Sequence, residues 1–308
     1  MKRCKSCGTA HPDQAVTCAK CGASLSGKTA AIPPADPPPV QPSDPEPRDL
    51  PLGYLPLAVV FERLKGSKTA VDALLKGMAP PGTYAGLKKL TDEQKLAKAR
   101  ELAADLKDLE PKKYKLLTPD SILICQCYRA LADKKPAKKV FDAIFGPDDE
   151  VEIKEPVARF CYRQGLTIFV EVPIGKSKAD IIGYRRTGKV RLIAVELKTR
   201  TEELKKCFAQ LMDYQSGVDR AFLATTPGAI VKYLCADKEE IDPRALDEEL
   251  RKCGAGLIVV DHRADVCTVV KQPPVGQPSQ ETRESLIRGC DKILEQWVPI
   301  APWSSKQV

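Results

Sequence analysis

The spacing of apolar positions separates a helical stretch of the chain from a later stretch in which helices and strands alternate. In the first stretch, Thr91 is a typical helix cap, and apolar residues follow it at helical spacing until Pro111 closes the run. A second helix is expected after Pro119, and a short third one around Ile144. These patterns predict a helical region over residues 53–147.

The pattern changes near residue 150, where short apolar runs bounded by turn residues replace the helical repeat. The predicted elements are a helix over Glu152–Arg163, strands over Leu166–Val172, Ala179–Arg186 and Val190–Lys198, a helix over Thr201–Ser216 and a strand over Arg220–Ala224. A helix over Gly228–Leu234, a hairpin of strands Leu257–Val260 and Val266–Val270, and a helix from about Glu281 to Trp297 are expected to follow. The order helix, three strands, helix, strand predicts an α/β domain over residues 148–308.

Two further segments precede the helical region. Residues 26–52 are rich in proline, with Ala, Asp, Ser and Glu between the prolines, and are expected to form an extended linker. Residues 1–25 are too few to fold through apolar burial alone. The chain is therefore predicted to carry a separate N-terminal module on a linker.

Paired cysteines in that module indicate a metal site. Cys4 and Cys7 form one Cys-x2-Cys knuckle, and Cys18 and Cys21 form a second. Four thiolates from two tight turns suit tetrahedral Zn²⁺, whose binding supplies folding energy on the order of 10 kcal/mol. A redox pair or disulfide is the alternative. The module resembles the short zinc ribbons of many bacterial and archaeal proteins. What it binds is left open between phosphate groups and a protein partner.

Composition adds a preference for an anionic partner. The 308 residues carry a formal net charge of +8. Residues 61–140 hold 18 Lys and Arg against 10 Asp and Glu, a surplus equal to the whole net charge. Solvated helix faces are the alternative reading of this surplus. The other cysteines lie mostly in apolar runs, and no apolar run approaches the ~20 residues of a membrane helix, so a reducing, cytoplasmic location without a membrane partner is expected.

Three charged residues of the α/β stretch form the candidate catalytic group. Glu196 and Lys198 are two apart, so in a strand they share one face and Leu197 takes the other. If the segment around Asp180 pairs with that strand, the three charged groups converge. Two carboxylates on one edge suit a hard divalent cation such as Mg²⁺, and a neighbouring lysine suits activation of a water for phosphodiester hydrolysis.

In this element order, residues 150–226 resemble the PD-(D/E)XK nuclease superfamily. Asp180 matches the acid of the second strand, and Glu196-Leu197-Lys198 matches Asp/Glu-x-Lys on the third, although Ala179 stands in place of the proline. Gln210 and Tyr214 match the Gln-x3-Tyr pair of the RecB-like branch. The resemblance implies a restriction-endonuclease-like αβββαβ core, preceded here by the zinc ribbon and the helical region.

The resemblance also implies roles for individual residues. Asp180, Glu196 and the Leu197 carbonyl would bind Mg²⁺, and Lys198 would orient or activate the water. Glu155 would add a carboxylate from the first helix, and Gln210 and Tyr214 would position substrate or Lys198. Lys176 and Lys178 precede Asp180 and would meet a phosphate backbone. The expected substrate is DNA, with RNA and a homodimeric state left open.

Two other classes of function compete with a nuclease. A binding protein with this fold would hold nucleic acid without cutting it, whereas an adaptor would use the ribbon and basic helices to recruit proteins. Each residue also has a structural alternative: Glu196 and Lys198 could be a solvated strand face, and Glu155 an ordinary acid of a helix start. An acid and a lysine at the end of a buried strand are costly unless paired or metal-bound, which favours a site.

Overall fold

The fold comes from a computed structural model that describes residues 2–3, 10–11, 63–64, 68–132, 149–186, 191–236 and 240–295. The predicted zinc ligands Cys4, Cys7, Cys18 and Cys21, the linker and the predicted helix around Ile144 lie outside these residues. At the N-terminus, strand β1 (Lys2–Arg3) pairs antiparallel with β2 (Ala10–His11).

A mixed α/β unit with a six-stranded sheet forms the main body of the described chain. Its strands are β3 (Thr167–Ile174), β4 (Ser177–Arg185), β5 (Arg191–Leu197), β6 (Arg220–Thr225), β7 (Ala255–Asp261) and β8 (Val266–Lys271), in that spatial order. The strands β3, β4 and β5 pair antiparallel, β5, β6 and β7 pair parallel, and β8 returns antiparallel. The parallel strands therefore end at one common edge of the sheet, here called the carboxyl edge.

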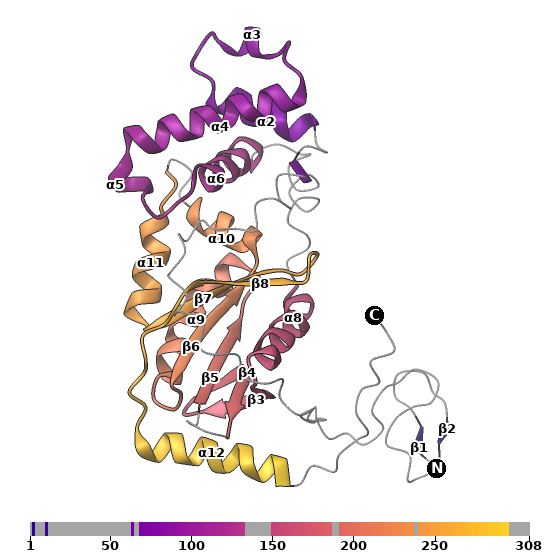
Figure 1. Cartoon of the computed structure of the whole chain (residues 1–308), viewed down its shortest axis with the longest axis vertical. Coiled ribbons are helices and arrows are strands. Elements are labelled where there is room, and N and C mark those ends of the chain that lie inside the picture. The colour runs from indigo at the N-terminus through magenta and orange to yellow at the C-terminus, as the bar shows by residue number, and fades with distance from the viewer. Residues whose placement is uncertain are drawn as a thin grey trace.

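Helices cover both faces of this sheet (Figure 1). Helix α8 (Glu150–Arg163) packs Ile153, Val157 and Cys161 against one face. On the other face lie α9 (Thr201–Tyr214), α10 (Pro227–Leu234) and α11 (Pro243–Lys252). Burial on both sides explains why β5 and β6 are almost wholly apolar.

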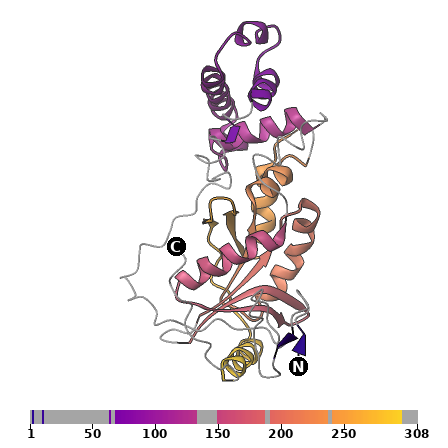
Figure 2. The same ribbon diagram turned by 90° about the vertical axis from the view of Figure 1, so that its right-hand side faces the viewer.

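A group of helices from residues 68–132, here called the helical unit, lies at one end of the molecule (Figures 1 and 2). Its members are α2 (Lys68–Met78), α3 (Tyr84–Leu87), α4 (Asp92–Leu109), α5 (Pro111–Tyr114) and α6 (Pro119–Ala132). Thr91 caps α4, as predicted, in a reciprocal capping box with Gln94. The helical unit and the α9 side of the sheet share one buried apolar cluster, with α6 packing against α10.

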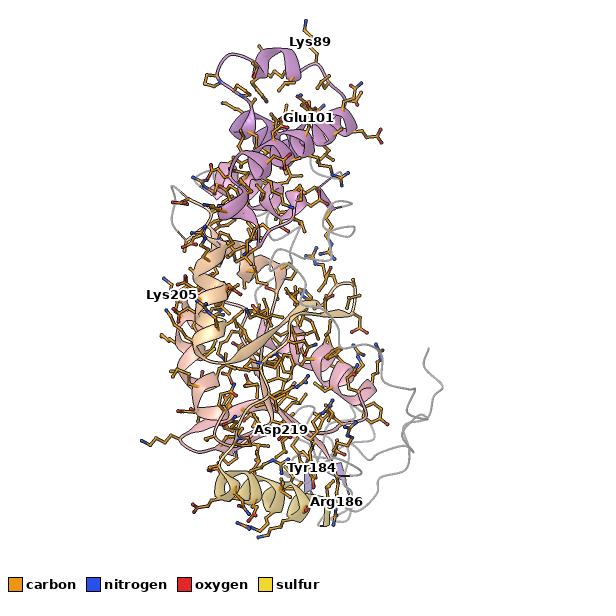
Figure 3. The ribbon with its side chains drawn as sticks, turned by 60° about the vertical axis from the view of Figure 1, so that its left-hand side comes forward. Lys89, Glu101, Tyr184, Arg186, Lys205 and Asp219 are labelled. Carbon is orange, nitrogen blue, oxygen red and sulfur yellow. The ribbon has the colours of Figure 1, made fainter. Side chains whose placement is uncertain are left out.

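The carboxyl edge of the sheet faces the helical unit. Asp261 ends β7 and is nearly buried, and it accepts hydrogen bonds from Arg63. At the opposite edge, Asp219 binds Arg283 of helix α12 (Gln280–Glu295), and Tyr184 donates to Asp291 of the same helix. Figure 3 shows Tyr184, Arg186 and Asp219 at this far end, well away from Lys89 and Glu101 of the helical unit.

The hairpin β3–β4 contains a crease at Glu171 and Asp180. Glu171 has a left-handed φ of 57° within a strand. Along β4, Ile181 packs on the α8 side, so simple alternation would also place Ala179 there, yet Ala179 joins the cluster on the α9 side. The alternation of faces thus breaks at Asp180. Both Asp180 and Glu171 lie between the pairs Val170–Ile181 and Val172–Ala179 of the register.

Several predicted elements need correction. Helix α8 begins at Glu150 rather than Glu152, because Asp149 caps it by accepting the Val151 amide. Strand β3 continues through Pro173, which is tolerated because β3 is an edge strand. The N-cap of α9 is Arg200, not Thr201.

Helix α11 was not predicted at all. It starts with Asp242 as cap and Pro243 as its first residue. Seven of the cysteines outside the ribbon are buried, which confirms their prediction as small apolar residues: Cys125, Cys127, Cys161, Cys207, Cys235, Cys253 and Cys290. Within the described residues, no helix has both the length and the apolar character to cross a bilayer.

Candidate active site

The candidate site lies where β5 ends at the carboxyl edge. Glu196 belongs to β5 and its side chain is buried toward α9, whereas Leu197 packs into the α8-side cluster. Lys198 follows the strand, and its backbone amide donates to the Ala224 carbonyl of β6. Asp180 comes from the crease of β4, and its carboxylate accepts the Leu197 amide at 2.8 Å. The neighbouring strands β4 and β5 thus bring the predicted charged groups together.

Oxygen atoms from four residues surround the Lys198 ammonium. Its Nζ lies 3.0 Å from Glu196 Oε1, 3.3 Å from Glu150 Oε1 and 3.9 Å from Asp180 Oδ2. It also donates to the Leu197 carbonyl at 2.8 Å. The oxygens of Asp180 and Glu196 thus lie within 3.9 Å of one cationic nitrogen at the end of β5. When all are ionised, the three carboxylates outnumber the single ammonium.

Tyr214 holds the far oxygen of Glu196. Its hydroxyl lies 2.5 Å from Glu196 Oε2 and 2.8 Å from the Lys178 carbonyl. The tyrosine is fully buried at the end of α9, so the helix fixes the carboxylate from the side away from Lys198. One side chain thereby ties β4, β5 and α9 together at the site.

Lys198 and the three carboxylates around it, Glu196, Asp180 and Glu150, are here called the charged cluster. The pKa values of its members reflect their burial and their closeness to one another. Burial raises the pKa of Glu196 and the nearby Asp180 charge adds to this, while Tyr214 and Lys198 oppose it. Burial would lower the pKa of Lys198, but Glu196, Asp180 and Glu150 together raise it. Burial also raises the pKa of Glu150, against the pull of Lys198. A cation placed among these carboxylates would relieve the cost of their charges.

The structure does not bring Glu155, the predicted helix acid, to the Lys198 ammonium, and Glu150 of the same helix lies there instead. Glu155 lies 3.1 Å from Arg159 and its side chain is 67% exposed. Glu150 precedes Ile153 by three residues, so both lie on the helix face that meets the sheet. Two features of the sequence indicate Glu150: its helical spacing from Ile153, and Asp149 as the capping residue just before it.

The other predicted residues lie near the cluster with different surroundings. Gln210 is one turn before Tyr214 on α9 and is partly buried. Lys176 is exposed in the turn between β3 and β4, and Lys178 is exposed on β4. The Lys178 ammonium binds Glu171 at 2.5 Å, so in this structure it is already paired.

Two threonines outside the predicted site, Thr199 and Thr225, also lie at the carboxyl edge. The hydroxyls of Thr199 and Thr225 are buried, and neither has a hydrogen-bond partner among the described residues. Thr226, by contrast, caps α10, because its hydroxyl accepts a hydrogen bond from the Ala229 amide.

The donor set at this edge fits a hard cation. Within the described ranges no group of three or more His, Cys, Asp and Glu side chains is arranged as a ready-made metal cage. Mg²⁺, however, usually binds through one or two carboxylates with water and substrate phosphate completing the shell. Asp180, Glu196 and the Leu197 carbonyl supply such a set, and the Lys198 ammonium lies against these oxygens.

Comparisons with known proteins add little to this picture. No protein-family model matches the chain, and no curated protein matches it. A solved structure, the SPO1766 protein of unknown function from Silicibacter pomeroyi, is similar over 48% of this chain and 86% of its own, at 18% identity and a TM-score of 0.35. A likeness at this level carries no argument about function.

Proposed function

We propose that the chain is a Mg²⁺-dependent nuclease that hydrolyses phosphodiester bonds in DNA. The observation that supports this most is the convergence of Asp180, Glu196, Glu150 and the Leu197 carbonyl on one cationic nitrogen at the end of β5. Carboxylate and carbonyl oxygens around a single positive charge, with a lysine among them, suit metal-assisted phosphoryl transfer.

The element order supports assignment to the PD-(D/E)XK superfamily. Helix α8, strands β3, β4 and β5, helix α9 and strand β6 follow one another along the chain, which is the order that the sequence resemblance implies. The acid at Asp180, the Glu-x-Lys run and Tyr214 lie at the corresponding elements. In this proposal the zinc ribbon and the linker are additions to that core.

Each residue has a distinct task in this proposal. Asp180, Glu196 and the Leu197 carbonyl hold Mg²⁺, which supplies Lewis acidity toward the phosphate when bound. Glu150 adds a carboxylate from the α8 side, directly or through water. Lys198 orients the attacking water and offsets negative charge that develops on the phosphate. Tyr214 fixes Glu196, and Gln210 lies one turn away to position substrate.

The substrate would approach the carboxyl edge, beside the helical unit. Exposed basic residues of this unit are available for backbone phosphates: Lys68, Lys76, Lys88, Lys89, Lys112 and Lys115. Such contacts give affinity without sequence preference and weaken with salt. The zinc ribbon would then add a second attachment, to nucleic acid or to a protein.

Incubation with plasmid and single-stranded DNA tests the proposal directly. Wild type should cleave in Mg²⁺ and not in EDTA, and Lys198→Ala should lose cleavage. Lys205→Ala, which removes an exposed lysine of α9 away from the cluster, is the matched control and should cleave as wild type does. Equal inertness of wild type and Lys198→Ala on DNA and RNA would refute nuclease activity. Metal-independent binding without cleavage would favour a binding protein instead.

A further inference from the structure

Glu171 lies between two lysines beside the candidate site. Its Oε2 binds Lys178 Nζ at 2.5 Å, and its Oε1 lies 3.6 Å from Lys154 Nζ. The three residues come from β3, β4 and α8, so three elements meet at this point. All three side chains are accessible, with exposed fractions of 53% for Glu171, 58% for Lys178 and 37% for Lys154.

The backbone at Glu171 is unusual for the residue it carries. A left-handed φ of 57° in a strand is a conformation that glycine or asparagine adopts more readily than glutamate. Strain of this kind persists where the surroundings hold the residue in place, and it gathers at functional sites. Here the crease directs the Glu171 carboxylate between the two ammonium groups.

The position of this group relates it to the proposed chemistry. Lys154 follows Glu150 by four residues, so both lie on neighbouring turns of one helix face. Lys178 precedes Asp180 by two residues, and its carbonyl oxygen lies 2.8 Å from the Tyr214 hydroxyl. Glu171 and Asp180 lie between the same two pairs of the β3–β4 register, Val170–Ile181 and Val172–Ala179. The lysine pair is thus adjacent to the carboxylates that would hold the metal.

We propose that Lys154 and Lys178 form a binding subsite for a phosphodiester group, and that Glu171 occupies this subsite as an internal mimic of the phosphate. A carboxylate that gives one oxygen to each ammonium presents the same pattern as the two non-bridging oxygens of a phosphodiester. The ligand is the nucleic-acid backbone next to the scissile bond, so this inference rests on the proposed function. Substrate entry displaces Glu171, and the carboxylate competes with nucleic acid for the two lysines.

The competition predicts that removing the Glu171 charge tightens binding. Glu171→Gln should bind a DNA oligonucleotide in EDTA about twofold to fivefold more tightly than wild type at low salt, the equivalent of one exposed ion pair. Glu171→Gly, which accepts the left-handed φ, should give the same gain. Lys154→Met with Lys178→Met should weaken binding and reduce the slope of log K against log salt by about 0.7 to 0.9.

Glu155→Gln is the matched control, because it also removes one acidic charge from an exposed ion pair near this face, the one with Arg159. Fluorescence anisotropy in a salt series gives the affinities of wild type and the four variants. Equal affinity of Glu171→Gln and wild type, or an equal gain in Glu155→Gln, overturns the phosphate subsite while DNA cleavage by wild type still stands. If wild type neither binds nor cleaves any nucleic acid, the proposed function fails together with this inference.

Discussion

Replacing Tyr214 by phenylalanine removes one buried hydroxyl from the centre of the candidate active site. That hydroxyl faces Glu196 Oε2 at 2.5 Å, and Glu196 is itself only 1% exposed. The substitution therefore leaves a buried carboxylate oxygen without its donor. A hydrogen bond to a charged group contributes about 1.5–3 kcal/mol, so we expect the free energy of unfolding to fall by about 2 kcal/mol. In a domain of this size that corresponds to a drop in Tm of about 4–8 °C.

The pH dependence of this loss follows from the ionisation of Glu196. Burial raises the pKa of Glu196 above its ordinary value of 4.5, and the Tyr214 hydrogen bond opposes that rise. A carboxyl with a raised folded-state pKa favours folding while protonated, and that contribution disappears as the pH increases through the folded pKa. Without Tyr214 the pKa rises further, so ionised Glu196 costs more. The Tm difference should be largest at neutral pH and should narrow as the pH falls toward 4.5.

Differential scanning fluorimetry in EDTA across a pH series measures this difference. Tyr233→Phe is a suitable control, because Tyr233 is partly buried and its hydroxyl has no hydrogen bond to any described residue. A Tm for Tyr214→Phe within one degree of wild type at neutral pH, or a difference that grows toward acid, would refute the reasoning about Glu196.

Further substitutions separate the roles of the remaining groups. Glu150→Gln should reduce kcat in Mg²⁺ by about tenfold or more, whereas Glu155→Gln should retain wild-type kcat, and steady-state cleavage of a labelled oligonucleotide distinguishes them. Lys198→Ala should lose cleavage yet bind Mn²⁺ at least as tightly as wild type by titration calorimetry, because the competing ammonium is gone; loss of metal binding as well would contradict the cluster geometry. Purified wild type should contain about one zinc ion per chain by elemental analysis and Cys4→Ser should contain less, and equal zinc contents would exclude the ribbon site.

The helix acid shows how far sequence reasoning reached at this site. The sequence predicts the convergence of Asp180, Glu196 and Lys198, because Glu196 and Lys198 are two residues apart and because β4 pairs with β5. The break in alternation at Asp180 is not visible in the sequence. The expected helix over Glu152–Arg163 leaves out Glu150, because its start lies two residues after the true one. Ile153 and Val157 define the buried face, and Glu150 is in phase with them while Glu155 is not.

Other features of the fold depend on contacts that periodicity does not encode. The path of β3 beyond Pro173 depends on its place at the sheet edge, which only the strand order reveals. The left-handed Glu171 gives no local sign, since glutamate has no preference for that conformation. Helix α11, in contrast, had readable signals in the Asp242 cap, Pro243 and the pair Leu246 and Leu250.

Four residues of the site lie within positions 180–214 of the chain. They are Asp180 on β4, Glu196 on β5, Lys198 just after β5, and Tyr214 on α9. Contacts between residues so near in sequence close short loops, which costs little chain entropy and favours early formation during folding. Glu150 joins from the preceding helix, with one further strand between. Apart from Glu150 and the Ala224 carbonyl that anchors the Lys198 amide, one short stretch of the chain therefore supplies the whole charged cluster.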